Sequence, residues 1–271
     1  MNLHQQTDQQ LAQKNKELKK QYQEAYKDIK YKVLEEYGKL GLNAEMTEQE
    51  KLKKSKRFVA KMTELISSHL VDTNKNAVGE VNKQLNNFYQ ENYNGTIQSL
   101  KEQGIDGDKI TKKETKEELE NNPNPFNVIA VDNLKDKNQT QRKVQDMLFT
   151  AVLGGFNLTM LKKLFEDGLR SVMNILTTQG TRMENMAMYD ALLEMQPDCL
   201  KEGYSITKVW ISQKDEKVRD AHARADGQEV DIDRPFYVNG EALMYPADMS
   251  GSPANIINCR CYMQFYLRKV A

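Results

Sequence analysis

The feature of this sequence that most limits its fold is a stripe of apolar residues at helical spacing near its start. Between residues 7 and 40 the apolar side chains are separated by steps built from three and four, and Lys, Gln and Glu fill most other positions. Thr7 and Gln10 form a capping-box pattern at the start, and Gly38 and Gly41 mark the end. So narrow a stripe predicts a long solvated helix that packs against one partner helix. The stripe comprises Leu11, Leu18, Tyr22, Ala25, Ile29, Val33 and Leu40.

Two further helices and a linker are predicted after this one. A second capping box, at Thr47 and Glu50, precedes an apolar stripe that reaches Leu70, and a third helical stretch covers residues 75–103. Residues 104–125 combine glycines, a run of charges and the sequence Asn-Asn-Pro-Asn-Pro. These residues predict a loop and a domain boundary.

The second half of the chain changes from a helical pattern to a strand pattern. Residues 139–196 are helical in pattern and rich in Met, with a break at Gly154-Gly155. After Pro197, residues 204–211 alternate as a strand does, turns follow, and residues 259–267 read as another strand. The predicted fold is mainly α with a small C-terminal α+β module: long amphipathic helices, then a helical bundle, then a short sheet. The corresponding domains are an extended helical arm and linker over 1–125, a bundle over 126–200 and the module over 201–271.

Composition excludes several classes of protein. Of the 271 residues, 39% are hydrophobic and 29% are charged, and the mean hydropathy is −0.75, which favours long solvated helices joined to a smaller core. The 39 basic and 39 acidic residues cancel, so no global charge attracts the chain to nucleic acid or to a membrane, although Lys is clustered early. No secretory signal and no long apolar run is present, so no membrane span is expected. Three cysteines, two of them close together, fit a reducing compartment.

Rare residue types gather in the last third of the chain. Spacings of three and four would place four polar side chains on one helical face: Asp215, Arg219, His222 and Asp226. On that face Asp215 would pair with Arg219. The Asp226 carboxylate would reach the His222 ring. Cys259 and Cys261 are two residues apart, so on a strand both thiols would point the same way.

Three interpretations of His222, Cys259 and Cys261 stay open. Two thiolates and an imidazole suit tetrahedral zinc, with Asp226 or Asp215 as a fourth ligand or as the carboxylate that orients the ring. In the second, a cysteine is a nucleophile and His222 its base, but nothing in the sequence supplies an oxyanion hole. In the third, the residues are ordinary packed side chains, since Cys is commonly buried. The small core beside them would consist of Trp210, Phe236 and Leu243.

With these residues the sequence resembles the C-terminal signature of the phage Mu F-like minor head proteins, the head-morphogenesis family of tailed phages. The resemblance covers residues 204–267, and the helical stretch before it carries Arg182 and Asn185 where members often have Arg and Asn. Thr178-Gln179 stands where a Thr-Glu pair is common, and the first 130 residues fall outside the resemblance. The signature is carried by Trp210, Asp215, Val218, Arg219, His222, Asp226, Gly227, Phe236, Leu243, Tyr245, Pro246, Asp248, Gly251, Asn258, Cys259, Arg260 and Cys261.

The resemblance implies a virion component and not an enzyme. Members are minor capsid proteins, present in few copies, that associate with the portal and act in procapsid assembly, DNA packaging or DNA delivery. The implied partners are the portal protein and other capsid or scaffolding proteins, with a weak contact to double-stranded DNA at most. The implied location is the capsid interior or the portal vertex, after assembly in the host cytoplasm. The alternative is a metal- or Cys/His-dependent effector enzyme that carries the same module.

The predicted site is therefore a stabilising centre. His222, Cys259 and Cys261 are the predicted ligands of a zinc ion, with Asp226 as the candidate fourth, and no catalytic residue is predicted. A module of about 65 residues buries little apolar surface, so a metal or a partner would support it. Structural roles are predicted for Trp210, Asp215, Arg219, Gly227, Pro246, Asp248, Asn258 and Arg260.

Overall fold

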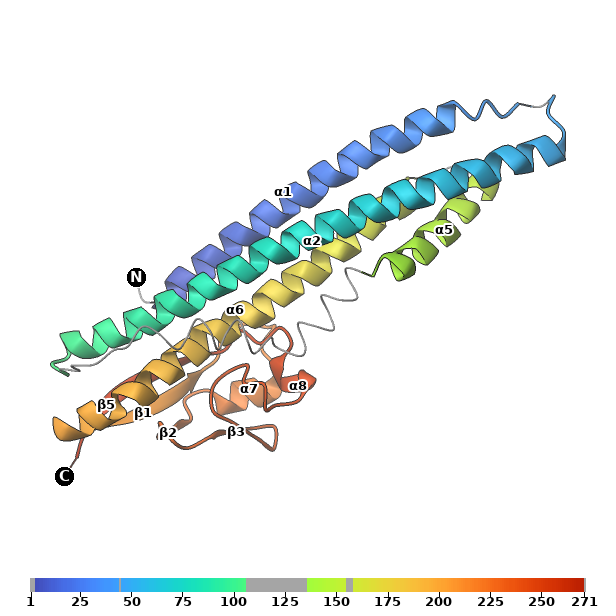
Figure 1. Ribbon diagram of the computed structural model, residues 1–271. Helices are drawn as coiled ribbons and strands as arrows, with labels where there is room; N and C mark the ends of the chain where they lie inside the picture. The colour runs from blue at the N-terminus through green and yellow to red at the C-terminus, as the bar shows by residue number, and fades with distance from the viewer. Residues whose placement is uncertain (1–2, 44, 106–135, 155–157, 271) are drawn as a thin grey trace. The chain divides into compact units, whose positions relative to one another are not determined.

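Long helices make up most of the computed structural model, which describes residues 3–43, 45–105, 136–154 and 158–270. A small C-terminal part of short helices and strands lies beside the last long helix (Figure 1). The predicted fold class, mainly α with a small α+β module, is confirmed. No helix in the described ranges is both long and apolar enough to cross a membrane. The long helices are α1 (Leu3–Gly38), α2 (Glu48–Glu102), α5 (Lys137–Gly154) and α6 (Thr159–Lys201).

The starts of the first two helices test the two predicted capping boxes. α1 begins at Leu3, so Thr7 is not its cap: Thr7 is buried within the helix and its Oγ1 donates to the Leu3 carbonyl. The second box is confirmed, because Thr47 Oγ1 accepts from the Glu50 N–H at 3.3 Å and the Glu50 carboxylate accepts from the Thr47 N–H at 2.9 Å. A capping-box pattern therefore marks a helix start only where no helical turn precedes it.

α2 is one continuous helix where the sequence predicted two. In α2, the polar residues near its middle are satisfied without ending the helix: Thr73 Oγ1 donates to the His69 carbonyl, and Asn74 Oδ1 accepts from the Tyr22 hydroxyl at 2.6 Å. α6 contains Pro197 and continues to Lys201, so the predicted end at residue 196 is wrong. The predicted linker and the boundary at residue 125 lie outside the described residues.

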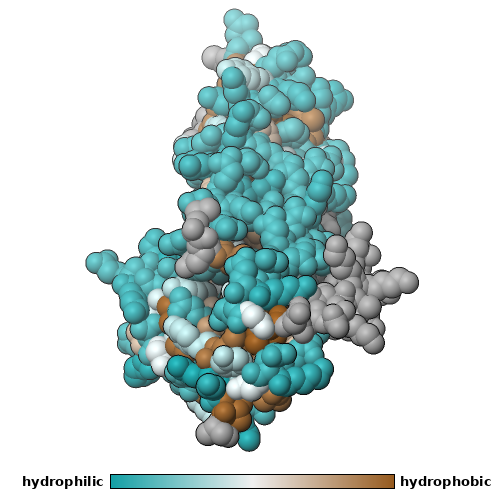
Figure 2. Space-filling view, turned by 90° about the vertical axis from the view of Figure 1, so that its left-hand side faces the viewer, coloured by the Kyte–Doolittle hydropathy of each residue, from teal (hydrophilic) through white to brown (hydrophobic). Residues whose placement is uncertain are grey.

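The chain divides into two compact units, and neither is a continuous stretch of sequence. One includes the described residues of Met1–Gln13, Val81–Pro123 and Asn174–Ala271, and the other those of Lys14–Glu80 and Asn124–Met173. In the second unit the apolar stripes of the helices form the core, as the periodicity predicted. Its buried members include Leu18, Tyr22, Ile29, Val33, Val59, Met62 and Ile66. Much of the face shown in Figure 2 is hydrophilic, with hydrophobic side chains gathered in patches toward its lower part.

The first unit contains the two small antiparallel sheets. β1 (Tyr204–Ile211) is the central strand of the order β2-β1-β5, and β5 (Tyr262–Lys269) pairs along its whole length, from Tyr204 opposite Lys269 to Ile211 opposite Tyr262. The two strands that the sequence predicted therefore pair with each other. β3 and β4 form a separate hairpin whose turn, Asn239-Gly240, has positive φ at both residues, as a two-residue hairpin turn requires. The remaining elements are α7 (Asp220–Ala225), β2 (Glu229–Asp231), β3 (Phe236–Val238), β4 (Glu241–Leu243) and α8 (Pro253–Ile256).

The first turns of α1 belong to the same unit as these sheets. The His4 ring stacks on Tyr262 of β5 with 3.7 Å between ring centroids, and His4 Nδ1 lies 2.7 Å from the carboxylate of Glu184, which is buried in α6. Leu11 fits against Gly180, where a Cβ atom would stand 2.6 Å from the leucine Cδ2. Because Gly180 has no side chain, α1 approaches α6 closely there. The first turns of α1 lie outside the family resemblance. They thus belong to the same unit as residues 204–267, which the resemblance covers.

Candidate metal centre

Three short elements deliver the predicted ligands. His222 lies in α7, which ends before Gly227 (φ 79°). Cys259 follows α8, which begins with Pro253 in its first turn, and Cys261 directly precedes β5. Between α8 and the cysteines, Asn258 adopts a left-handed conformation (φ 55°), which Asn tolerates better than most residues. This turn redirects the chain from α8 into β5 and explains the Asn of the Asn-Cys-Arg-Cys sequence.

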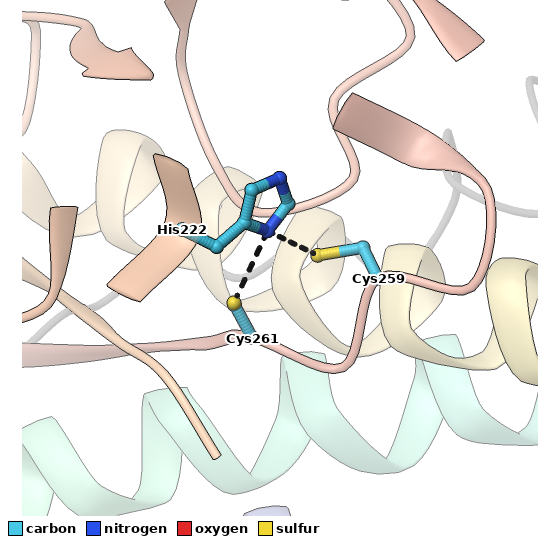
Figure 3. Close-up of side chains that lie close together, drawn as sticks. All are labelled: His222, Cys259 and Cys261. Atoms are coloured by element: carbon cyan, nitrogen blue, oxygen red, sulfur yellow. Dashed lines mark hydrogen bonds between the residues drawn. The ribbon is translucent and has the colours of Figure 1, made fainter. Parts of the chain in front are cut away.

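The three side chains meet around one ring nitrogen. His222 Nδ1 lies 3.6 Å from Cys259 Sγ and 3.4 Å from Cys261 Sγ (Figure 3). All three ligand atoms lie within 4.8 Å of one another. The residues are 1–2% exposed, and both cysteines are free thiols. The structure therefore brings together the three predicted ligands.

This arrangement fits a zinc ion better than it fits hydrogen bonds alone. An imidazole nitrogen has either one lone pair or one proton, so Nδ1 cannot form a good hydrogen bond with both sulfurs. Tetrahedral zinc with its usual bond lengths separates a nitrogen ligand from a sulfur ligand by about 3.5 Å. The two observed distances bracket that value. Among the described residues no fourth His, Cys, Asp or Glu joins the group.

Asp226, the predicted fourth ligand or orienting carboxylate, lies elsewhere. Its Oδ1 accepts from the Ser212 N–H at 2.7 Å, and its Oδ2 lies 3.3 Å from Lys214 Nζ. Burial alone would raise the pKa of Asp226, but these two partners outweigh it and hold the pKa below its ordinary value. Asp226 thus fixes the turn between β1 and α7 and does not touch His222.

Asn255 orients the ring instead. Its side-chain oxygen lies 3.4 Å from His222 Nε2, and its amide donates to Glu241 Oε2 and to the Val238 carbonyl. With its amide so engaged, Asn255 presents an acceptor to Nε2, and a neutral ring that donates from Nε2 would have Nδ1 available to bind a metal ion. Metal-bound imidazoles are commonly held in this way by a polar group at the second nitrogen. No spacing in the sequence singled out Asn255.

The two thiols interact strongly with each other. The pKa of Cys259 falls to about 5, because Cys261 donates a hydrogen bond to its thiolate and His222 adds to this, against the effect of burial. The pKa of Cys261 rises far above its ordinary value, because of the neighbouring Cys259 and burial. The two thiols therefore resist losing both protons, and a bound cation would be needed to stabilise the second thiolate.

Trp210 closes the centre from the β1 side. It has no exposed surface, and its ring meets the rings of His222 and Phe236 edge-on, with centroids 5.6 and 5.5 Å away. Its indole Nε1 is buried and has no hydrogen-bond partner among the described residues. Leu243 lies opposite Phe236 in the hairpin and is also fully buried. The predicted core of Trp210, Phe236 and Leu243 is confirmed.

α6 holds the cysteine segment from the other side. Thr178 Oγ1 accepts from the Asn258 N–H at 2.9 Å, and the Asn185 amide donates to the Cys261 carbonyl at 3.2 Å. Both α6 residues are buried. The two backbone groups that they bind, at Asn258 and Cys261, precede and follow Cys259 in the sequence. These contacts fix the backbone that carries the two thiols. The sequence pointed to Asn185 only through the family resemblance, and it gave no role to Thr178.

Among the other predicted structural residues, Asp215 and Arg219 do not form the pair that was expected. Asp215 precedes α7, so it does not share a helical face with Arg219; it forms a bidentate pair with Arg260, at 2.6 Å for each bond. Arg219 donates to the Ile257 carbonyl. Asp248 accepts from the N–H groups of Met244 and Ser250 and so shapes the loop after β4. Two more of the set sit in turns: Gly227 donates to the Trp210 carbonyl at 2.8 Å, and Pro246 is buried.

The sequence did not reveal a buried lysine in this unit. Lys208 of β1 has no exposed surface, and its Nζ donates to the Met244 carbonyl at 2.7 Å. The ammonium lies 4.6 Å from the centre of the Tyr189 ring and 5.2 Å from that of Phe236. Burial lowers the pKa of Lys208 to about 8, although Asp248 and Asp233 act in the opposite direction. The alternating strand pattern had assigned this position no special role.

Comparisons with known proteins find a family for part of the chain. The family model described as "Phage Mu protein F like protein" matches residues 142–264. The NAD(+)–arginine ADP-ribosyltransferase EFV of Enterococcus faecalis is 28% identical over 96 residues, which cover 35% of this chain and 19% of that protein. The aligned part is thus a small fraction of that relative. No solved structure matches the chain. Over residues 142–264, the chain is therefore similar to the phage Mu F-like family of head-morphogenesis proteins.

Proposed function

We propose that this protein is a minor component of a tailed-phage head, located at the portal vertex on the capsid interior. The observation that carries the proposal is the family match over residues 142–264. The portal protein is its main partner, with other capsid or scaffolding proteins around it, and few copies are present in each head. It acts in procapsid assembly, DNA packaging or DNA delivery, and it is recruited in the host cytoplasm.

Two physical features support a docking role. The long helices carry hydrophilic surfaces, and the small module exposes apolar side chains: Tyr237 is 67% exposed and Ile257 is 46% exposed. Aromatic and aliphatic anchors of this kind, surrounded by polar residues, are typical of protein interfaces.

Heads made with a tagged copy of the protein test the proposal. Chemical cross-linking in purified procapsids should join the protein to the portal protein, and its amount should correspond to a few copies per portal ring. A protein recovered only outside the heads, or cross-linked uniformly to the shell, would contradict the proposal.

We propose further that the module is stabilised by one zinc ion held by His222 Nδ1, Cys259 and Cys261. Bound there, the ion would balance the thiolate charge and join α7 to the segment that leads into β5. Elemental analysis of gently purified protein should find about one zinc per chain. Cys259→Ser and Cys261→Ser should each lose the metal, whereas Cys199→Ser, at a third buried cysteine in α6, should keep it. Less than about 0.2 zinc per chain in the wild type would refute this proposal.

We propose that this centre is structural and that the protein is not an enzyme. The three side chains are 1–2% exposed, which leaves a substrate no access to the sulfurs or the ring. Purified protein mixed with NAD⁺ and an arginine-containing acceptor should leave both unchanged. Turnover that disappears in Cys259→Ser, with the fold retained, would instead support the effector-enzyme alternative.

A further inference from the structure

The start of α2 carries a cluster of basic residues with no acidic residue among them. Between Lys51 and Thr63 there are six Lys or Arg residues and no Asp or Glu. The whole chain has a net charge of zero, so this run is a local departure from the average. Basic clusters on a helix are typical of surfaces that bind phosphate groups.

Half of these cations already have partners within the protein. Lys51 pairs with Glu48 and Lys61 with Glu36, while Lys54 donates to the Leu40 carbonyl. The other three are Lys53, Lys56 and Arg57. All three are exposed, and none forms an ion pair in the part of the chain that the structure describes. Their spacing of three and four places them on one turn of the solvent face.

A groove beside Arg57 extends the same surface. It lies between the end of α1 and the start of α2 and is lined by Lys39, Lys54, Arg57 and Lys61, with Glu36 as its one acidic residue. Glu36 is shared by Lys61 and Lys39, and their ammonium groups lower the pKa of its carboxyl. The groove therefore keeps an excess of positive charge.

We propose that Lys53, Lys56 and Arg57, with the adjoining groove, bind the phosphates of double-stranded DNA without reading its sequence. A polyanion of regularly spaced phosphates matches a row of cations on a rigid helix. A membrane surface fits less well, because the apolar side of this helix, including Phe58 and Met62, is buried in the protein and cannot insert into lipid. The choice of DNA over other polyanions rests on the proposed function, since DNA is the content of a phage head.

The number of free cations sets the expected strength. Each neutralised phosphate contributes about −0.9 to the slope of log K against log salt, so three contacts predict a slope of about −3. Binding should lie in the range of non-specific complexes, with Kd of about 10⁻⁴ to 10⁻⁶ M at physiological salt. A contact this weak agrees with the zero net charge of the chain.

Fluorescence anisotropy with the full-length protein and a random-sequence duplex tests the inference. Lys53→Gln/Lys56→Gln/Arg57→Gln should weaken binding at least about tenfold at ~50 mM salt and remove most of the salt slope. The matched control is Lys16→Gln/Lys19→Gln/Lys20→Gln, which removes the same charge from exposed positions of α1 and should bind as the wild type does. Circular dichroism checks that both variants fold.

Three results would overturn the inference: no binding by the wild type, equal loss in both variants, or wild-type binding by the α2 variant. Tighter, salt-dependent binding to anionic vesicles or to polyglutamate than to DNA would also overturn it. The outcome is separable from the proposed function. If the α2 variant still enters heads and cross-links to the portal, a failed DNA measurement removes only this inference. DNA binding by a protein absent from heads would remove only the portal role.

Discussion

At the scale of single residues, Lys208 shows how a charge is retained inside a small sheet. The Met244 carbonyl, two aromatic faces and the nearby carboxylates of Asp233 and Asp248 surround its ammonium group. These contacts replace only part of the lost hydration, which is why burial still lowers the pKa of Lys208 to about 8. β1 is thereby tied to the loop after β4.

This lowered pKa predicts a rise in stability at alkaline pH. Between pH 8 and 10.5 the unfolded chain keeps the Lys208 proton and the folded chain loses it, so the free energy of unfolding increases with pH, by roughly 3 kcal/mol at most. Lys208→Met should lack this contribution. Urea unfolding of both proteins across that pH window measures the difference, and parallel curves would contradict the assignment.

Asn255 and Asp226 offer a second prediction, about the metal. Asn255→Leu removes the acceptor at His222 Nε2 and should lower zinc affinity by about 10–100-fold, as measured by competition with a chromogenic chelator. Asp226→Asn, at the position that the sequence favoured, should change affinity little because Asp226 does not touch the ring. The reverse order of effects would restore Asp226 as the orienting group.

At the scale of elements, α6 is the support on which the cysteine segment is built. Thr178→Val keeps the shape of the side chain but leaves the Asn258 N–H without its acceptor on α6, so it should destabilise the protein by about 1 kcal/mol. Ser171→Ala on the same helix is the control, since Ser171 is exposed and its loss should cost under about 0.5 kcal/mol. Thermal unfolding compares the two variants, and equal shifts in Tm would show that the hydrogen bond between Thr178 and Asn258 contributes nothing to stability.

The elements also show what sequence periodicity captures. Alternation predicted β1 and β5 close to their observed bounds, because a half-buried strand needs its two faces to differ. The joining of two predicted helices into α2 was not predictable, since it depends on Tyr22 of another helix satisfying Asn74. The same limit applies to the site. The three candidate ligands, His222, Cys259 and Cys261, stand out as rare residue types. Asn255 and Thr178 are common types, and their roles arise only from tertiary contacts.

At the scale of the unit that contains the sheets, His4 joins α1 to α6 and β5. Burial lowers the pKa of His4, but its hydrogen bond and charge interaction with Glu184, aided by Asp8, outweigh this and leave the pKa raised above 6.5. Burial also raises the pKa of Glu184. In the folded state, His4 and Glu184 thus each hold a proton to higher pH than they do in the unfolded chain.

A pH dependence follows from this pair. Since the pKa of His4 is raised on folding, its contribution is complete below pH 6.5 and is lost as pH rises through the raised pKa. Hydrogen exchange of β5 amides, corrected for the intrinsic effect of pH, should therefore show falling protection above that pH. His4→Phe keeps a ring to stack on Tyr262 and should remove the dependence. An unchanged profile in that variant would exclude His4 as its source.

The contact between His4 and the last strand also sets the order in which the protein is completed during translation. Gln213 and Tyr262 reach the His4 ring across separations of about 200 residues or more, so at ~5–20 residues per second the first turn of α1 waits for on the order of ten seconds or longer before it meets β5. Until then β1 has one unpaired edge on the nascent chain, and two of the three candidate zinc ligands do not yet exist. Metal capture would then wait until Cys259 and Cys261 have been made, and a chain stopped short of Cys259 would be left with an open strand edge that quality control can detect.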